Sequence, residues 1–240
     1  MTNLRSLYYW TIGLGYFGPI LIVLIIRSFF QTPHDYDNWL RRRLNFLFNL
    51  LNSSPNIEFA EALPTDKPLI FMSNHSSLID VPLLKAIIPQ YFVGVLAHHQ
   101  LNYFLYGPAV TRMGSIAIDR TNVRQSLRSF EQAKELINQG INITVLPEGG
   151  RSLDGRLLPF KKLPFRFAKE SGASIVPISI SGVFKMKNKG SLQLRPGRLV
   201  ARFGAIITAD KIAKLDINEL MDMTHERIQG GLEPFETRPH

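Results

Sequence analysis

Hydrophobic positions are unevenly distributed along the chain, and their spacing changes near residue 56. Residues 7–26 form a continuous apolar run, "LYYWTIGLGYFGPILIVLII", which contains no charged side chain. A run of about 20 apolar residues is the shortest that usually crosses a bilayer as a helix. The run therefore predicts a helical membrane element that is retained in the protein.

A second helix is predicted after a break at Pro33. Residues 36–51, "YDNWLRRRLNFLFNLL", repeat apolar side chains at helical spacing and carry the arginine cluster Arg41–Arg43. A basic amphipathic helix of this type is typical of a membrane surface, although the same pattern also fits a helix packed on the protein's own core. The preceding apolar run favours the membrane, so residues 1–51 are predicted to form a two-helix membrane anchor.

From residue 56 onward, short apolar runs alternate with amphipathic segments. Residues 122–140 read as a helix capped by Asn122, and residues 216–231 read as a final capped helix. Alternating strands and helices predict one α/β domain over residues 56–240, with a mostly parallel sheet flanked by helices. The predicted strands cover residues 69–73, 91–97, 115–118, 142–147, 174–180 and 199–204.

Composition narrows the chemistry that is possible. The chain has no cysteine, which excludes disulfides, thiolate metal sites and a cysteine nucleophile. Its formal net charge of +9 suits nucleic acid, anionic lipid or polyanionic metabolites alike. Between Gly155 and Ala209 the only acid is Glu170, among many lysines and arginines. The stretch "FKMKNKGSLQLRPGR" within this region is predicted to be a basic loop that faces lipid headgroups or the phosphates of CoA, or else a solvated charged face.

The stretch "NHSSLID", residues 74–80, carries a histidine and an aspartate five positions apart. On one continuous helix the two side chains would point about 140° apart around the axis. The stretch follows a predicted strand, however, and a strand-to-helix turn can curl His75 back over Asp80. Alternatively, Asp80 or Ser77 only caps the following helix, and His75 is an ordinary loop residue.

Two more polar clusters follow predicted strands, "GSIAIDR" (114–120) and "LPEGGRS" (146–152). Parallel α/β sheets bind ligands beyond the carboxyl ends of their strands. The guanidinium groups of Arg120 and Arg151 suit phosphate, because each is permanently charged and can bond two oxygens at once. Together with "NHSSLID", these clusters predict a single site for an anionic ligand.

These blocks, together with "IVPISI" and the linking stretch "LDGRLLPFKK", resemble the ordered motifs of the glycerophospholipid acyltransferases. The resemblance is closest to the 1-acyl-glycerol-3-phosphate (lysophosphatidic acid) acyltransferases and covers roughly residues 65–205. It implies the acyltransferase fold and the transfer of a fatty acyl group from acyl-CoA or acyl-carrier protein to the sn-2 hydroxyl of lysophosphatidic acid, giving phosphatidic acid. It also implies that His75 is the general base, that Asp80 is its partner, and that the acceptor's phosphate and glycerol lie at Arg120, Glu148, Gly149, Arg151 and Lys161.

In such a reaction the nucleophile is the acceptor's own hydroxyl, so the resemblance implies no metal and no cofactor beyond the acyl donor. The chain departs from the family's pattern at Gly150, where threonine is common, and at Leu163, where glycine is usual. Both departures concern the acceptor's head group, so glycerol-3-phosphate or another lysolipid stays open as the acceptor. A non-catalytic basic protein that binds membranes or nucleic acid is the other alternative, but it gives no reason for the His75–Asp80 pair.

The expected partners are lysophosphatidic acid, the acyl donor and anionic membrane lipids, and not nucleic acid. The expected location is the cytoplasmic face of a membrane of the bacterial inner-membrane type. Glycines and Pro19 interrupt the apolar run, and the arginine-bearing helix follows it closely. Both features favour a two-helix element that dips into one leaflet over a helix that crosses the bilayer.

Overall fold

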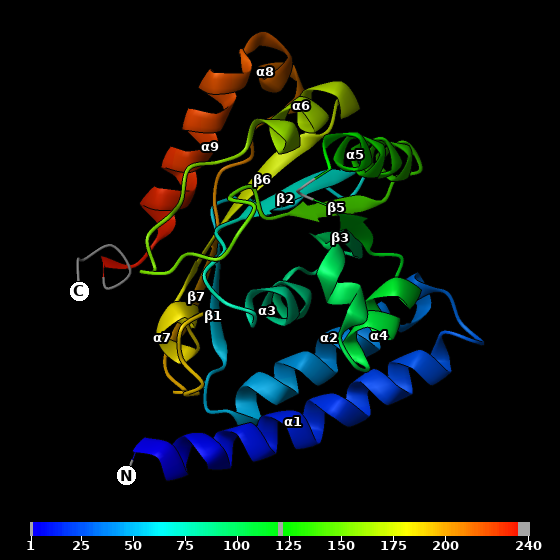
Figure 1. Ribbon diagram of the computed structural model, residues 1–240. Helices are drawn as coiled ribbons and strands as arrows, with labels where there is room; N and C mark the ends of the chain where they lie inside the picture. Colours follow the sequence, from blue (N-terminus) through cyan, green and yellow to red (C-terminus); the bar gives the residue numbers. More distant parts are fainter. Residues whose placement is uncertain (1, 120–121, 235–240) are drawn as a thin grey trace.

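A seven-stranded sheet forms the centre of the protein, whose computed structural model describes residues 2–119 and 122–234 (Figure 1). The spatial order is β1-β7-β6-β2-β5-β3-β4, and neighbouring strands are parallel except for β6 and β7. The predicted α/β fold with a mostly parallel sheet is therefore confirmed. The strands are β1 (Pro55–Phe59), β2 (Leu69–Ser73), β3 (Phe92–Ala97), β4 (Ile116–Ile118), β5 (Asn142–Val145), β6 (Ser174–Ser181) and β7 (Leu199–Phe203).

The sequence predicts β2 to β7 to within two residues at each end but misses β1. This strand pairs with β7 at the edge of the sheet and is mostly exposed. It carries Asn56 and Glu58 between its apolar side chains, so it lacks the continuous apolar run of the buried strands. A short, solvated edge strand leaves too weak a pattern to be recognised from the sequence.

Helices cover both faces of the sheet (Figure 1). Helices α1 to α4 pack on one face in one hydrophobic cluster, and α5, α6, α8 and α9 pack on the other face in a second cluster. The predicted cap of α5 is present, since the side chain of Asn122 accepts a hydrogen bond from the backbone N–H of Gln125 at 3.1 Å. The helices are α1 (Thr2–Arg27), α2 (Pro33–Leu50), α3 (Asp80–Ile87), the 3₁₀-helix η1 (His98–Asn102), α4 (Tyr106–Arg112), α5 (Val123–Asn138), α6 (Lys162–Ser171), α7 (Val183–Met186), α8 (Ala209–Lys214) and α9 (Ile217–Gly231).

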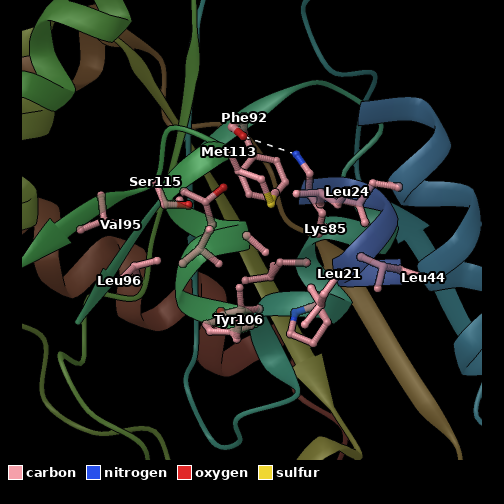
Figure 2. A pocket seen from close by; sticks show the side chains of 18 of the residues that line it. Leu21, Leu24, Leu44, Lys85, Phe92, Val95, Leu96, Tyr106, Met113 and Ser115 are labelled. Carbon is pink, nitrogen blue, oxygen red and sulfur yellow. Dashed lines mark hydrogen bonds between the residues drawn. The ribbon is translucent and has the colours of Figure 1, made fainter. Parts of the chain in front are cut away.

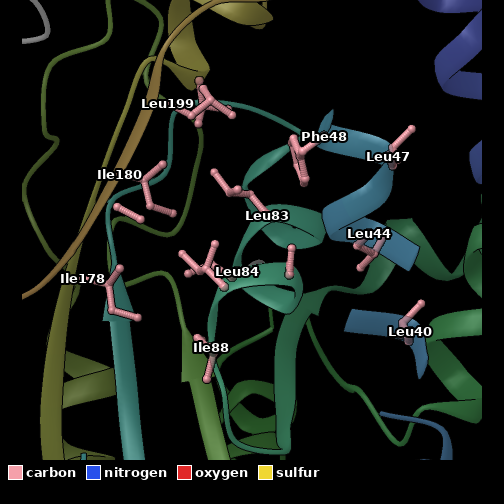
Figure 3. Close-up of a cluster of buried hydrophobic side chains, with 14 of the residues drawn as sticks. Leu40, Leu44, Leu47, Phe48, Leu83, Leu84, Ile88, Ile178, Ile180 and Leu199 are labelled. Atoms are coloured by element: carbon pink, nitrogen blue, oxygen red, sulfur yellow. The ribbon is translucent and has the colours of Figure 1, made fainter. Parts of the chain in front are cut away.

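Helix α2 buries its apolar face inside the protein. It begins at Pro33, earlier than the predicted stretch, because Thr32 and Asp35 form a capping box at its start. Its buried side chains pack against α3 and the strands β6 and β7 (Figure 3). The apolar stripe that the sequence assigns to a membrane surface is thus covered by the protein's own core. The α2 side chains of this cluster are Leu40, Leu44, Leu47 and Phe48.

The three arginines of α2 have different surroundings. Arg41 forms an ion pair with Asp37 at 2.6 Å and donates a hydrogen bond to the carbonyl of Pro89. Asp37 also pairs with the ammonium of Lys85 on α3, so a buried charge network joins the two helices. The side chains of Arg42 and Arg43 are exposed. Only these two remain available to meet an anionic surface.

Helix α1 lies along the protein with one apolar face outward. By length and composition it could span a membrane, with a mean hydropathy of 1.9 over its most apolar window. Its inner side chains, such as Leu24, are buried against α2 and α4, whereas Leu4, Leu7 and Leu14 are more than half exposed. Its two ends are hydrogen bonded to the rest of the chain. The contacts are Leu194 N–H to Ser6 Oγ (2.8 Å), Trp10 Nε1 to the Leu192 carbonyl (2.7 Å) and Arg112 Nη1 to Ser28 Oγ (3.4 Å).

The division of the chain into an anchor over residues 1–51 and a domain over residues 56–240 stays a prediction. Both N-terminal helices share a hydrophobic cluster with α3 and with strands of the sheet. Because α2 supplies a large part of that cluster, we expect the fold of residues 56–234 to depend on it.

Replacing Phe48 with alanine tests this dependence. The Phe48 side chain is 1% exposed, and its removal is expected to lower the free energy of unfolding by about 3–5 kcal/mol. The matched control is Phe46→Ala on the same helix, where the side chain is 47% exposed and the expected loss is about 1 kcal/mol or less. Denaturant unfolding of both variants in detergent micelles measures the difference, and equal losses would contradict the packing of α2 described above.

Candidate active site

The turn after β2 is anchored to the neighbouring strand β6. The side-chain amide of Asn74 donates to the carbonyl of Ile180 at 2.9 Å, and its oxygen accepts the N–H of Ile180 at 2.8 Å. Asn74 is buried, so this pair of bonds replaces the strand ladder where β2 ends. The next residue, His75, therefore leaves the sheet from a fixed point at the carboxyl end of β2.

His75 and Asp80 meet across the turn. Nδ1 of His75 lies 2.8 Å from Oδ2 of Asp80, and the same oxygen accepts the N–H groups of Ser76 at 2.7 Å and Ser77 at 2.8 Å. The cap position of α3 is Ile79, so Asp80 is the first residue of the helix and turns its carboxylate back to the loop. The curled arrangement predicted from "NHSSLID" is present.

The hydrogen bond to Asp80 determines which ring nitrogen of His75 carries the proton. Asp80 is 1% exposed and His75 is 7% exposed, so the hydrogen bond between them is shielded from water. An ionised carboxylate only accepts hydrogen bonds, which requires Nδ1 of His75 to carry the proton. Nε2 of the neutral ring then holds a free lone pair, which is the form that can remove a proton from a substrate.

Glu148 holds the backbone of the same turn. Its Oε1 accepts the N–H of His75 at 2.5 Å, and its Oε2 accepts the N–H of Leu158 at 2.9 Å. On the other side of His75, the carbonyl accepts the N–H of Ser152 at 2.9 Å. Burial raises the pKa of Glu148 to about 8, against the opposing effect of its two hydrogen bonds and with a small addition from the charge of Asp80. Both oxygens of this carboxyl group are thus occupied by the protein.

Gly149 and Lys161 lie together beside this glutamate. Gly149 has a positive φ of 69°, and a Cβ at this position would lie 3.2 Å from Cγ of Lys161. The backbone N–H of Lys161 donates to the carbonyl of Pro147 at 2.8 Å, which fixes the start of the lysine side chain. The side chain itself is exposed. The positive φ therefore favours a glycine at this position, and a Cβ would also crowd the lysine side chain.

Arg151 lies on the other side of the histidine turn, near Lys187. The hydroxyl of Ser77 donates to the carbonyl of Lys187, whose ammonium bonds the carbonyl of Asn188 at 2.7 Å. Burial lowers the pKa of Lys187, and the positive charge of Arg151 lowers it further. Arg151 thus has a second basic side chain in its electrostatic surroundings, although the ammonium of Lys187 already donates to the carbonyls of Asn188 and Ser191.

The sequence-based site residues are largely brought together. His75, Asp80, Glu148, Gly149 and Lys161 form one connected group, and Arg151 follows within the same loop. Arg120 lies outside the described residues.

Asn74 and Ser152, whose contacts fix the histidine turn, are not predicted as site residues from the sequence. Lys187 is predicted only as one member of the basic stretch. The asparagine beside the histidine was a local signal for an anchor, but its partner Ile180 lies 106 positions away.

No metal site is formed by the residues that the structure describes. Among residues 2–119 and 122–234, no group of three or more histidines, aspartates and glutamates is placed to hold an ion. His98 and His99 are adjacent and exposed on η1. The absence of a cofactor stays an expectation from the sequence.

An apolar cavity, here called the α3-side pocket, is lined by side chains such as Leu21, Leu24, Val95 and Tyr106 (Figure 2). It holds about 810 Å³ of empty space between helices α1 to α4 and the strands β3 and β5. One end is lined by Val81 and Pro82, which follow Asp80, and by Leu146, two residues before Glu148. The other end reaches Lys85 and Phe92 at the amino end of β3. An aliphatic chain fits a cavity of this kind.

The chain is similar in sequence to known proteins. A family profile described as "Acyltransferase" matches residues 54–181. The 1-acyl-sn-glycerol-3-phosphate acyltransferase of Limnanthes alba is 33% identical over 171 residues, which cover 71% of this chain and 61% of that protein. The protein of the same name from Cocos nucifera is 31% identical over 157 residues, 65% of this chain and 51% of that protein. The chain thus spans half to three fifths of the length of these curated relatives.

Among solved structures, the crystal structure of the 1-acyl-sn-glycerophosphate (LPA) acyltransferase PlsC from Thermotoga maritima superposes with a TM-score of 0.83. It covers 100% of both chains at 20% sequence identity, and so it shares the fold. The family profile includes the histidine turn, the glutamate loop and the strand β6 that anchors them. The chain belongs to the acyltransferase family.

Proposed function

We propose that this protein transfers a fatty acyl group from acyl-CoA or acyl-carrier protein to the sn-2 hydroxyl of 1-acyl-glycerol-3-phosphate, giving phosphatidic acid. The observation that carries the proposal is the buried His75–Asp80 pair, 2.8 Å apart, which is followed in α3 by Val81 and Pro82 in the lining of an apolar cavity. The names of the relatives from Limnanthes alba and Cocos nucifera support the choice of acceptor.

In the proposed reaction, Nε2 of His75 removes the proton from the acceptor's hydroxyl as its oxygen attacks the thioester carbonyl carbon. The carbon–sulfur bond then breaks, and the imidazolium returns the proton to the departing thiolate. Asp80 keeps the proton on Nδ1 and stabilises the imidazolium that forms between the two steps. General-base assistance of this kind typically accelerates a reaction by about 10²–10⁴-fold. Alignment of two bound substrates supplies the remainder.

The substrates divide between apolar and basic surroundings. The α3-side pocket takes the acyl chain that is transferred, because its lining includes the two residues after Asp80 and many aliphatic side chains. Arg151 and Lys161, with Arg120 by resemblance, bind the acceptor's phosphate. Glu148 acts as a positioning residue, since its two oxygens are already bonded to backbone N–H groups. Gly149 lets the loop approach the acceptor closely.

The membrane presents the lipid substrates to the site. We propose that α1 lies in one leaflet on the cytoplasmic face, with its outer apolar side chains among the lipid tails. Contacts at both ends of α1 with the rest of the chain support this position over a crossing of the bilayer. Anionic lipids would meet the exposed Arg42 and Arg43 and the basic stretch 184–198.

A matrix of acyl donors and acceptors, measured with the purified protein, tests the function directly. Lysophosphatidic acid is expected to be the best acceptor, ahead of glycerol-3-phosphate and of lysolipids with other head groups. A strong preference for one of those acceptors would replace the proposed substrate while keeping the reaction. Binding of lipids without any transfer would instead favour a non-catalytic membrane protein.

Replacing His75 with alanine is expected to abolish transfer while the protein stays folded, because no other group holds a basic nitrogen at this position. Asp80→Asn keeps the shape but removes the charge, and it is expected to lower kcat by about 10²–10⁴-fold. Initial rates, with thermal unfolding as the check on folding, measure both effects. Near-normal turnover by His75→Ala would exclude the proposed mechanism.

Arg151→Ala is expected to weaken binding of the acceptor much more than binding of the acyl donor. Losing one charge-assisted bond costs about 1.5–3 kcal/mol, which corresponds to a roughly ten- to hundredfold higher acceptor KM. Arg151→Lys should rescue only part of the loss. The control is Arg156→Ala in the same loop, where the side chain is 59% exposed and faces Asp154. An equal rise in both KM values would remove Arg151 from the phosphate site. The same result is expected for Arg120→Ala from the sequence.

The raised pKa of Glu148 predicts a specific dependence of stability on pH. The folded state keeps the proton up to about pH 8, whereas the unfolded chain releases it near its ordinary pKa of 4.5. The free energy of unfolding should therefore fall as the pH rises from about 4.5 to about 8. Glu148→Gln removes this dependence. The free energy of unfolding of the variant, minus that of the unchanged protein, should therefore increase as the pH rises from about 4.5 to about 8. Denaturant midpoints at several pH values measure it, and a constant difference would contradict the raised pKa.

A tag at the amino end tests the position of α1. With α1 in one leaflet, the tag and the catalytic residues lie on the same side of the membrane. Sealed vesicles are prepared in both orientations and digested with protease. The tag and a site engineered beside Arg156 should then be cleaved in the same vesicle preparation. Cleavage of the two sites in opposite preparations would show that α1 crosses the bilayer.

A further inference from the structure

A second apolar cavity, here called the α5-side pocket, lies on the opposite face of the sheet from the α3-side pocket. It holds about 670 Å³ of empty space between strands β3, β4 and β5 and the helices α5 and α6. Neither the proton transfer at His75 nor the pocket for the transferred chain uses this cavity. Its apolar lining includes Ile118, Phe130, Val145, Leu146, Leu163 and Pro164.

The two pockets converge at the catalytic edge of the sheet. Val95 and Leu146 line both of them. At Val95, strand β3 changes its partner from β5 to β4, so the ladder that separates the two faces opens at this point. Leu146 lies two residues before Glu148, whose carboxyl group holds the backbone of His75. The histidine turn is therefore adjacent to one end of each pocket.

The pockets differ in where they carry positive charge. The α5-side pocket has Lys161 beside Gly149, at the end nearest the glutamate loop. The lysine side chain is exposed, and within residues 2–119 and 122–234 it has no ion-pair partner. In the α3-side pocket the lysine is Lys85, which lies at the far end and is paired with Asp37. Only the α5-side pocket combines an apolar slot with an available cation at its catalytic end.

We infer that the α5-side pocket binds the acyl chain that the acceptor already carries, with the acceptor's phosphate at Lys161. This inference rests on the proposed function, in which two aliphatic chains reach the site together. A lysophospholipid joins one chain and one phosphate through glycerol, which matches a slot with one cation at its mouth. The lysine in the lining of the α3-side pocket, Lys85, is already paired with Asp37, so this pocket is left for the uncharged chain of the acyl donor. The two chains thus lie on opposite faces of the sheet, with the reacting atoms at His75 between them.

The test is direct binding of tritiated lysophosphatidic acid with a long (oleoyl) or a short (hexanoyl) chain to the full-length protein in detergent micelles. Two variants fill the α5-side pocket from different helices, Ser126→Phe on α5 and Leu163→Trp on α6. Each methylene group that is buried raises the affinity roughly fourfold. A variant that excludes several methylene groups from the pocket should therefore weaken binding of the long-chain ligand by at least roughly tenfold. Binding of the short-chain ligand should change little.

Two controls distinguish the loss of chain binding in the α5-side pocket from changes in the α3-side pocket and from loss of the phosphate contact. Gly94→Leu fills the α3-side pocket at a position where a Cβ has no neighbour within 4 Å, and it should leave the binding of both acceptors unchanged. It should instead shift transfer toward shorter acyl-CoA donors. Lys161→Ala should weaken the long-chain and short-chain acceptors by the same factor, because it removes only the phosphate contact. Thermal unfolding identifies any variant that fails to fold. If one of the two filling variants does not fold, the other one tests the inference.

Loss of long-chain binding in the filling variants, with retention in Gly94→Leu, supports the inference. Unchanged long-chain binding in the folded filling variants overturns it, as does a loss confined to Gly94→Leu. Because binding is measured without turnover, these outcomes are independent of the catalytic test. A protein that binds lysophosphatidic acid as inferred but transfers no acyl group would overturn the proposed function alone.

Discussion

A single oxygen of Asp80 organises the catalytic turn. Oδ2 accepts the imidazole N–H of His75 and the backbone N–H groups of Ser76 and Ser77, all within 2.8 Å. Three donors around one buried carboxylate oxygen stabilise its charge and leave the turn little freedom. Glu148 then fixes the same turn through the N–H of His75. The position of the base is thus set by two carboxyl groups, and neither of them needs to touch the substrate.

The sheet gives these groups a frame with two different faces. On one face, α1 to α4 enclose the α3-side pocket and present the outer apolar side of α1. On the other face, α5 and α6 enclose the α5-side pocket, with Lys161 at its mouth. Because the carboxyl ends of the parallel strands meet at one edge, the apolar pockets and the basic loop reach the histidine from different directions. This layout suits a reaction in which two aliphatic chains bind on opposite faces of the sheet and only the reacting atoms meet.

The sequence predicted what depends on local spacing. Buried strands such as β2 have continuous apolar runs, and the contact between His75 and Asp80, five positions apart, follows from a short strand-to-helix turn. It could not predict what depends on distant partners. The periodicity of α2 gives an apolar face but does not say whether lipid or the α3 helix covers it. The resemblance assigns Glu148 to the acceptor, and it does not predict the bonds of its two oxygens to the backbone N–H groups of His75 and Leu158.

The central claim is that Asp80 keeps the proton of neutral His75 on Nδ1 and leaves Nε2 free. Nitrogen-15 chemical shifts of the imidazole, measured on the full chain with labelled histidine, test it most directly. Assignment by comparison with His75→Ala identifies the signal, and Asp80→Asn provides the contrast. The account predicts a protonated Nδ1 and an unprotonated Nε2 in the unchanged protein, with a mixture of both tautomers in Asp80→Asn. A proton on Nε2 in the unchanged protein, or the same spectrum in both proteins, would contradict it.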